Sequence, residues 1–315
     1  MKKKYLLACL ALCISLSACG SQNSKEVKST TSKNTAKSEK TTEACTSEKS
    51  TSKEASIKKS TVKKESSLQA ELEKLETKSK EYDNVDTSYM KQGEMNDVAR
   101  KRYYLWEDEI NSIWKRLYPK LSASTKKKLL DEQRKWIAQK DRDTFAAGIT
   151  FEGGSMQPLI TYPRAEMITR KRIYELAKKL ADLNGESFVV SPEVQNELNK
   201  GNPTLDQVFE LFKGKWVDDS NSAKYIGIAR ASEKSEYAPK GSSWVVWNSE
   251  GDIVSDLDYY GFSEENIIFK KKDKDGTYTY YWLSIYDDHS HAYLSHSKDK
   301  DKLYEAGNGI GGKRG

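Results

Sequence analysis

The stretch NDVARKRYYLWEDEINSIWKRL, residues 96–117, decides the fold of the region around it. Its apolar side chains recur at steps of three and four residues, at Ala99, Tyr103, Trp106, Ile110, Ile113, Trp114 and Leu117. That spacing places them on one face of an α-helix and leaves the charged residues on the other face. The segment predicts a long amphipathic helix that begins near Gly93 and ends at Tyr118-Pro119.

Similar periodicity surrounds this helix on both sides. A shorter amphipathic helix is expected from Leu68, and a helix capped by Ser122 or Ser124 is expected to run through Trp136 and Ile137. The loop GITFEGGSMQPLITYP follows, and a last helix is expected from about Arg164 to Leu183. Residues 67–185 therefore predict an all-helical domain of three to four helices, which is large enough for its own core.

The pattern changes after Asn184-Gly185. Residues 186–203 form a linker, and two short helices are expected between Ser191 and Phe212. The next region spans about residues 204–306, and from Lys213 onward its apolar period becomes two, in the segments GKWVDD, AKYIGIARA, SSWVVW, DIVSDLDYYGF, NIIFKKK, TYTYYWLSIY and HAYLSH. These segments predict a small antiparallel β domain, either a barrel or a sandwich, and residues 307–315 are expected to be a flexible tail. The expected fold class is α + β in separate domains.

The N-terminal end has the layout of a secretory signal peptide. Lys2, Lys3 and Lys4 precede an apolar run that is shorter than the ~20 residues of a membrane-spanning helix. The run ends in Leu16-Ser17-Ala18-Cys19, which resembles the lipobox of bacterial lipoproteins. The resemblance implies removal of residues 1–18, a lipid on Cys19, and a membrane-anchored protein at the extracytoplasmic face. The alternative is an ordinary signal peptide with a cysteine near its cleavage site.

Residues 19–66 are rich in Ser, Thr, Lys and Glu and lack aromatic side chains, so we expect a disordered tether. With residues 1–18 removed and a lipid on Cys19, Cys45 is the only cysteine that remains, so we expect no disulfide within the mature chain. We interpret Cys45 as incidental, and a disulfide between two molecules is the alternative.

The net charge of +6 is distributed unevenly. Residues 67–183 carry 23 basic against 19 acidic side chains, whereas residues 204–306 carry 13 against 19. Much of the excess positive charge therefore lies in the tether rather than on a folded surface, which argues against nucleic acid as a partner. The acidic β domain suits a basic partner, although simple solubility explains the same charge.

An ordered series of residues in the helical domain resembles a known family. The series comprises Gln92 to Asn96, Trp106, Glu109 to Asn111, Leu130, Gln133 to Ile137, Asp141, Gly153 to Ser155, Thr169 and Arg172. It is similar to the lysozyme inhibitor LprI-like family over about residues 88–180. The resemblance implies a helical fold and binding of lysozyme or another cell-wall protein. Two cysteines of many relatives would fall near Val98 and Thr144, and Glu107 and Ile110 replace the usual Asp and Leu.

Most of the matching residues are expected to be structural. Trp106, Trp114 and Trp136 lie on apolar faces and should pack in the core. Asn111 and Gln133 are expected to point inward and to bond across helix interfaces.

Asp141 completes the family motif. The candidate interaction loop is Gly153, Gly154, Ser155, Met156 and Gln157, because paired glycines let a backbone approach a partner closely. A plain interhelical turn is the alternative.

The chain shows no motif for nucleophilic catalysis, phosphate binding or HExxH metal chemistry, so we expect neither an enzyme nor a cofactor. His289 and His291 are weak candidates for a zinc site, since residues at i and i+2 share one face of a strand. The leading hypothesis is a lipid-anchored, lysozyme-inhibitor-like protein that acts by occlusion. The alternative is a surface adaptor or ligand-binding lipoprotein without inhibitor activity.

Overall fold

The structure is a computed structural model that describes residues 67–218, 221–234, 236–237, 243–285, 291–304 and the backbone of 310–314. Val62–Gly315 forms one compact unit. The predicted signal peptide, Cys19, the tether and Cys45 lie outside the described residues. Within those ranges, no helix combines the length and apolar character needed to cross a membrane.

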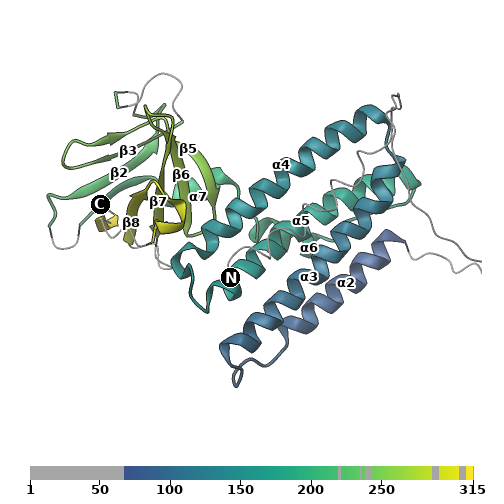
Figure 1. The fold of residues 1–315 in the computed structure, drawn as a ribbon. Coiled ribbons are helices and arrows are strands. Elements are labelled where there is room, and N and C mark those ends of the chain that lie inside the picture. The colour runs from purple at the N-terminus through teal and green to yellow at the C-terminus, as the bar shows by residue number, and fades with distance from the viewer. Residues whose placement is uncertain are drawn as a thin grey trace, which may run out of the picture. The chain divides into compact units, whose positions relative to one another are not determined.

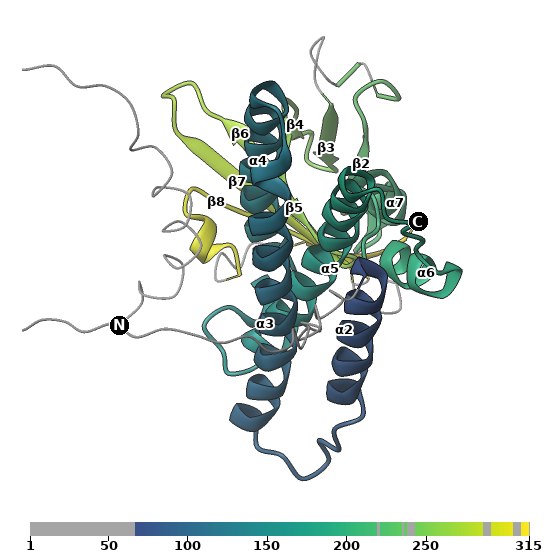
Figure 2. The ribbon, with the colours of Figure 1, turned by 90° about the vertical axis from the view of Figure 1, so that its right-hand side faces the viewer.

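The first part of this unit is helical, as predicted, and its long helices run alongside one another (Figures 1 and 2). The elements are α2 (Leu68–Asp83), α3 (Gln92–Leu117), η1 (Tyr118–Lys120), α4 (Ala123–Gly148), η2 (Ile149–Phe151), α5 (Gln157–Asn184), α6 (Pro192–Lys200) and α7 (Leu205–Phe212). Ser122 caps α4 by accepting a hydrogen bond from the backbone of Thr125. The two short helices expected between residues 191 and 212 are α6 and α7.

The start of α5 differs from the prediction. The helix begins at Gln157 rather than near Arg164, and Pro163 lies inside it. A proline inside a helix is usually unfavourable, because it removes one backbone donor and its ring crowds the preceding turn. Here Pro163 is tolerated in the second turn, and Pro158 occupies the first turn, where no donor is needed. The loop before α5 is therefore shorter than the sequence suggested.

Packing between α3 and α5 is the most extensive helix contact. Trp106 is completely buried at the centre of this core, and its indole Nε1 donates to Ser79 Oγ on α2 at 3.0 Å. Trp114 and Trp136 are partly buried and pack against the same core. The tryptophans thus occupy the packing positions that the periodicity predicted.

Antiparallel strands follow the helices, and the prediction of an α + β fold is confirmed. The strands are β1 (Gly214–Val217), β2 (Tyr225–Arg230), β3 (Trp244–Asn248), β4 (Ile253–Val254), β5 (Asp258–Phe262), β6 (Asn266–Lys272), β7 (Tyr278–Ile285), β8 (His291–Ser297) and β9 (Ile310–Arg314). Their order is β4-β3-β2-β1-β9-β8-β7-β6-β5. Two four-stranded halves are joined through β9, and no pairing between β4 and β5 closes a barrel in the described part of the chain.

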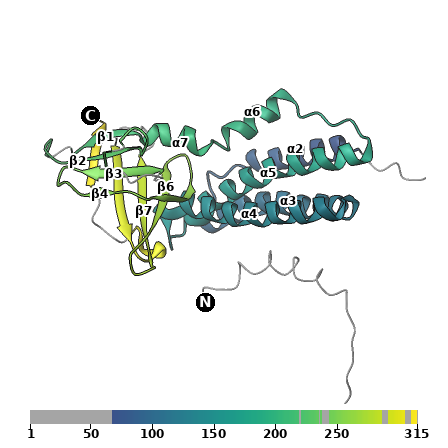
Figure 3. The ribbon, with the colours of Figure 1, turned by 90° about the horizontal axis from the view of Figure 1, so that it is seen from above.

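The prediction of a frayed tail is wrong for residues 310–314. This segment pairs with β1 on one side and with β8 on the other (Figure 3). Its glycine-rich sequence offers few side chains to pack, which is why it was expected to fray. Strands, however, pair through backbone N–H and C=O groups, which do not depend on side chains. The backbone of β9 pairs with the edges of β1 and β8, which would otherwise lack a partner on that side.

Both halves of the sheet share one apolar core. Helix α7 adds Phe209 and Phe212 to it, and Trp216 of β1 donates its indole N–H to the Phe212 carbonyl at 2.8 Å. Ile228 and Val246 come from one half of the sheet, and the other half contributes Ile267, Phe269 and Leu283. The sheet is therefore folded over a common interior even though its hydrogen-bond ladder stays open.

The helical part and the sheet meet where α4 packs on β5. The Asp143 carboxylate accepts the Phe262 backbone N–H at 3.0 Å in a buried setting. Beside it, a small apolar cluster combines Ala146 and Ile149 with Ile268, Trp282 and Leu303. Gly261 leaves no room for a side chain at this contact, since a Cβ would lie 2.4 Å from the Arg142 carbonyl oxygen.

Replacing Gly261 with alanine should therefore destabilise the protein. The Gly261→Ala methyl would meet rigid backbone, and overpacking of this kind typically costs ~1–3 kcal/mol. Urea unfolding of the full chain measures the loss. The matched control is Gly93→Ala, because a Cβ at Gly93 has nothing within 4 Å and lies in the first turn of α3. Equal stability of the two variants would contradict the described α4–β5 contact.

A second prediction concerns the pH dependence of this junction. Burial raises the pKa of Asp143 to about 6, and hydrogen bonds from Phe262 and Gln139 oppose the shift only in part. The folded state therefore binds more protons than the unfolded chain between about pH 4 and pH 6, and stability falls as pH rises through this window.

Asp143→Asn keeps an oxygen that can accept the Phe262 N–H but carries no charge. We expect it to reduce this slope and to raise the free energy of unfolding at pH 7 by ~2–3 kcal/mol. Chemical denaturation at several pH values is the measurement. Asp131→Asn, at an exposed position of the same helix, is the control and should leave the slope intact. An unchanged slope in Asp143→Asn would refute the assignment.

Candidate functional site

The predicted interaction loop is an exposed turn between η2 and α5. Gly153 has a φ of +74°, a conformation that favours glycine, and the Gly154 N–H donates to the Phe151 carbonyl at 2.9 Å. Gly153, Gly154, Ser155 and Met156 are all exposed. Gln157 is different, because it is the first residue of α5 and its side chain accepts from the Gly153 N–H at 3.2 Å. Gly153–Met156 thus form the exposed tip of the loop, and the Gln157 side chain stabilises the tip through its hydrogen bond to Gly153.

A side chain on α3 ties this loop to the helices. Asn96 Nδ2 donates to the Ser155 carbonyl oxygen at 2.8 Å, across 59 residues of sequence. Gln92, one turn earlier, in turn donates to Asn96 Oδ1 at 2.9 Å and holds the amide in that orientation. The loop is therefore held by hydrogen bonds from α3 as well as by the hydrogen bonds of its own turn.

Three tyrosines form a cluster on the α3 and α5 side of the loop. Tyr103 and Tyr104 are on α3 and Tyr162 is on α5, with ring centroids 5.3, 5.8 and 6.5 Å apart. Asn96, Arg100 and Tyr104 follow one another at four-residue steps, so they share one face of α3. We call Gly153–Met156 together with Tyr103, Tyr104 and Tyr162 the loop–tyrosine surface. Met156 (41% exposed) and Tyr104 (43% exposed) are its most exposed large side chains.

A largely buried ion pair holds Tyr103, one of the residues of this surface, in place. The Tyr103 hydroxyl donates to Glu107 Oε2 at 2.8 Å, and Lys140 Nζ lies 3.1 Å from both of those oxygens. The Lys140 ammonium also lies 5.2 Å from the centroid of the Trp136 ring, within the range of a cation–π contact. Glu107 therefore links α3 to α4 through Lys140.

Of the remaining motif residues, Gln133 is buried between helices, whereas Asn111 and Asp141 are exposed. Gln133 is buried on α4 and its Oε1 accepts from Arg172 Nε on α5 at 3.0 Å, so it bonds across the helix interface. The prediction for Asn111 was wrong, because its side chain is exposed and donates to the Glu107 carbonyl of its own helix at 2.8 Å. A one-residue error in helical phase, 100°, is enough to turn a side chain outward. Asp141 is exposed on α4.

The two candidate metal ligands are not assembled into a described site. His291 lies in β8, and His289 falls outside the described residues. A group of three or more His, Cys, Asp or Glu side chains with metal-binding geometry is absent from the portion of the chain that the structure covers.

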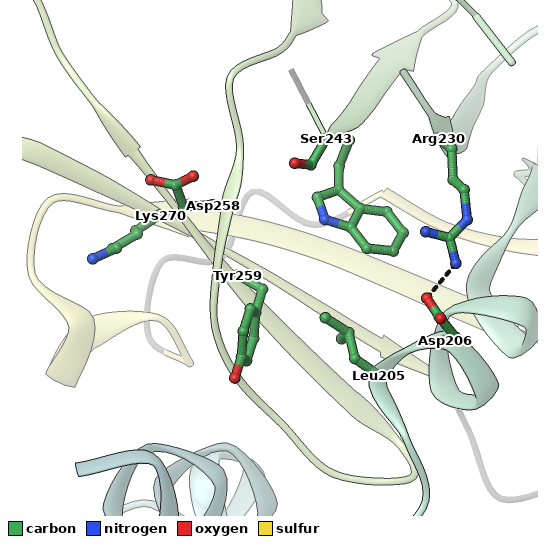
Figure 4. A pocket seen from close by; sticks show the side chains of 8 residues that line it. Leu205, Asp206, Arg230, Ser243, Asp258, Tyr259 and Lys270 are labelled. Atoms are coloured by element: carbon green, nitrogen blue, oxygen red, sulfur yellow. Dashed lines mark hydrogen bonds and ion pairs between the residues drawn. The ribbon is translucent and has the colours of Figure 1, made fainter. Parts of the chain in front are cut away.

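A pocket of about 560 Å³ opens on the sheet, at a place the sequence did not indicate (Figure 4). Its lining comes from α7 and four strands and comprises Leu205, Asp206, Arg230, Ser243, Trp244, Asp258, Tyr259 and Lys270. Desolvation by burial raises the pKa of Tyr259, and the nearby Asp143 carboxylate adds to the shift. The phenol is therefore neutral and can both donate and accept hydrogen bonds.

Sequence reasoning missed both the tyrosine cluster and this pocket. The Tyr103-Tyr104 doublet was a usable signal, because one of two adjacent large aromatic residues on an amphipathic helix must face away from the core centre. The pocket had no comparable signal, since its residues come from five separate elements.

The fold class, then, is α + β, with an exposed loop and aromatic cluster on its helical part. A comparison with protein families finds that residues 82–176 match the family model Lysozyme inhibitor LprI. The matched stretch runs from the end of α2 into α5 and contains the whole loop–tyrosine surface. The LprI-like domain recognised in the sequence is thereby confirmed. No curated protein and no solved structure matches the chain.

The buried Lys140–Glu107 pair yields a test of the site's scaffold. Lys140→Met should destabilise the protein by about 3 kcal/mol, because Glu107 then loses its cationic partner in a partly buried position. The double variant Lys140→Met/Glu107→Gln should recover much of that loss, since no net charge is then buried. Urea unfolding of all variants measures both effects. Lys135→Met, exposed on the same helix, controls for the loss of a lysine, and a double variant no better than Lys140→Met would refute the pairing.

Proposed function

We propose that this protein is a lysozyme-inhibitor-like binding protein that acts by occluding its target rather than by catalysis. The observation that carries the proposal is the family match, because it covers the exposed loop together with the tyrosine cluster. An inhibitor of this type needs no reactive side chain. It needs a firmly held protrusion that enters a cleft and a surrounding surface that excludes water.

The loop–tyrosine surface supports such a role. Tyrosine is enriched among the residues that dominate binding energy in protein interfaces, since its ring offers a large area with few rotatable bonds. Tyr104 and Met156 would serve as anchors, and the glycine turn would allow close approach of the backbone. Because Asn96 already fixes the loop, binding would cost little ordering entropy.

The proposed attraction to a cationic target rests on the acidic residues of the strand-rich part. Residues 204–306 carry 19 acidic against 13 basic side chains, which suits approach to a cationic enzyme. The helical part is mildly basic and would not attract such a target by itself. The strand-rich part would therefore supply the electrostatic steering.

Anchoring is part of the same proposal and is supported by the sequence. The lipobox-like Leu16-Ser17-Ala18-Cys19 would place a lipid on Cys19, and residues 20–66 would tether the folded unit at the extracytoplasmic face of the membrane. A flexible tether of this length would let the inhibitor reach lysozyme where the enzyme acts on the wall.

The alternative is a surface adaptor or ligand-binding lipoprotein without inhibitor activity. The pocket on the sheet favours this second candidate, because it provides a place for a small ligand. Retention of the full chain on purified cell wall, without any effect on lysozyme, would support it over the first proposal.

The test is lysozyme-driven clearing of a suspension of cell walls, measured with the full chain in detergent. We expect inhibition, and we expect Met156→Lys and Tyr104→Ala each to weaken it about tenfold, through lost apolar contact and, for lysine, repulsion of a cationic enzyme. Absence of inhibition by the unaltered chain, at concentrations well above that of the enzyme, would refute the function.

Two control variants distinguish loss of the contact surface from a general loss of stability. Leu183→Lys and Tyr89→Ala make the same chemical changes at exposed positions of the helical part outside the loop–tyrosine surface. Both should inhibit like the unaltered chain. If all four variants behave alike while inhibition persists, the contact surface lies elsewhere.

A further inference from the structure

The pocket on the sheet has aromatic and aliphatic walls. Figure 4 shows the Tyr259 ring beside Leu205, and the Trp244 indole belongs to the same lining. Trp244 is 5% exposed, and its ring meets Phe209 edge-on at a centroid distance of 4.0 Å, so its position is fixed by the core. Tyr259 packs edge-on against Phe262 at 6.1 Å. The walls are therefore built into the fold.

One side of the pocket carries an oriented guanidinium. Arg230 forms an ion pair with Asp206, drawn as the dashed line in Figure 4, and its Cζ lies 4.9 Å from the ring centroids of both Phe209 and Trp244. A guanidinium has five N–H donors in a rigid plane, and the bond to Asp206 uses one. Asp206 adds carboxylate acceptors at the same edge, and Ser243 and Asp258 place further polar groups on the rim.

The charges that line the pocket cancel. Arg230 and Lys270 contribute two positive charges, and Asp206 and Asp258 contribute two negative charges. The Lys270 ammonium lies 5.3 Å from the Tyr278 ring centroid, a contact with a residue that does not line the pocket. A balanced lining of this kind gives no net attraction for an anion such as a phosphate or for a cation. Four charged side chains also make it a poor site for a purely apolar ligand, because their hydration would be lost without compensation.

We propose that this pocket binds a neutral saccharide. A sugar ring presents an apolar C–H face and an edge of hydroxyl groups, and the pocket offers the complement of both. The apolar face would stack on the half-buried Tyr259 ring, and hydroxyl groups would bond to the paired Arg230 and Asp206. The pocket volume lies within the 300–1,000 Å³ typical of small-molecule sites. Oppositely charged neighbours of this type both donate to and accept from hydroxyl groups.

The test uses isothermal titration calorimetry of the full chain with four trisaccharides. Two are neutral, triacetylchitotriose and cellotriose, and two are charged, the cationic chitotriose and the anionic trigalacturonate. We expect at least one neutral probe to bind and to bind more tightly than either charged probe. No binding of either neutral probe, or tighter binding of a charged one, would overturn the proposal.

Variants locate the binding. Tyr259→Ala should weaken binding about tenfold, whereas Tyr259→Phe keeps the ring and should lose only a few-fold. Arg230→Lys should weaken binding several-fold, since lysine lacks the planar fork. Tyr304→Ala, an exposed tyrosine of the same part of the chain, is the matched control and should bind normally. Equal binding by Tyr259→Ala and Tyr304→Ala would overturn the assignment to this pocket.

Two further measurements keep the test decisive. Ser243→Phe puts a ring on the exposed rim without removing a core side chain, and it should block binding even if Tyr259→Ala unfolds. Saccharide binding and lysozyme inhibition are also separable, because the pocket shares no residue with the loop–tyrosine surface. Ser243→Phe should inhibit lysozyme like the unaltered chain, so failure of one proposal leaves the other measurable.

Discussion

A buried carboxylate at the junction helps to join the helical part of this protein to its sheet. Asp143 lies near the C-terminal end of α4 and accepts the Phe262 backbone N–H of β5, beside an apolar cluster that both parts share. Without this acceptor, a buried strand N–H would lose its partner, at a cost of ~1–3 kcal/mol. Burial also raises the pKa of Asp143, because a negative charge at the junction is itself unfavourable. The junction therefore gains a defined geometry at some expense of stability.

The long helices rely on buried charge in a similar way. Arg170 joins Glu76 of α2 to α5, and Arg102 of α3 bonds to the nearly buried Glu166 of α5. Pairs of this kind contribute little net stability, since desolvation offsets their attraction. Their consequence is alignment, because a shifted helix would leave a buried charge without its partner. Residues 67–185 contain no cysteine, so such polar contacts and Trp106 fix how α2, α3 and α5 lie against one another.

The sequence predicted what depends on local pattern. Apolar spacing located α2, α3 and α4, and alternation located the strands, because both reflect which face of one element is buried. Prediction from the sequence failed where a segment's structure depends on residues that are distant in the chain. Pro163 inside α5 and the pairing of Ile310–Arg314 are tertiary results, since neither segment has a local preference for the structure that it adopts. The loop tip was predictable from its paired glycines, whereas Asn96 as its anchor and the pocket around Trp244 were not.

The central place of β9 has a consequence for how the sheet is assembled. Each four-stranded half is built from strands that neighbour one another in sequence, so each can arise from local hairpins. Joining them requires residues 310–314 to meet β1, almost a hundred positions earlier in the chain. Closing so long a loop is slow, and until it happens both inner edges lie open to pairing with other chains. The seam between the halves is thus the step at which this protein is most exposed to aggregation while it folds.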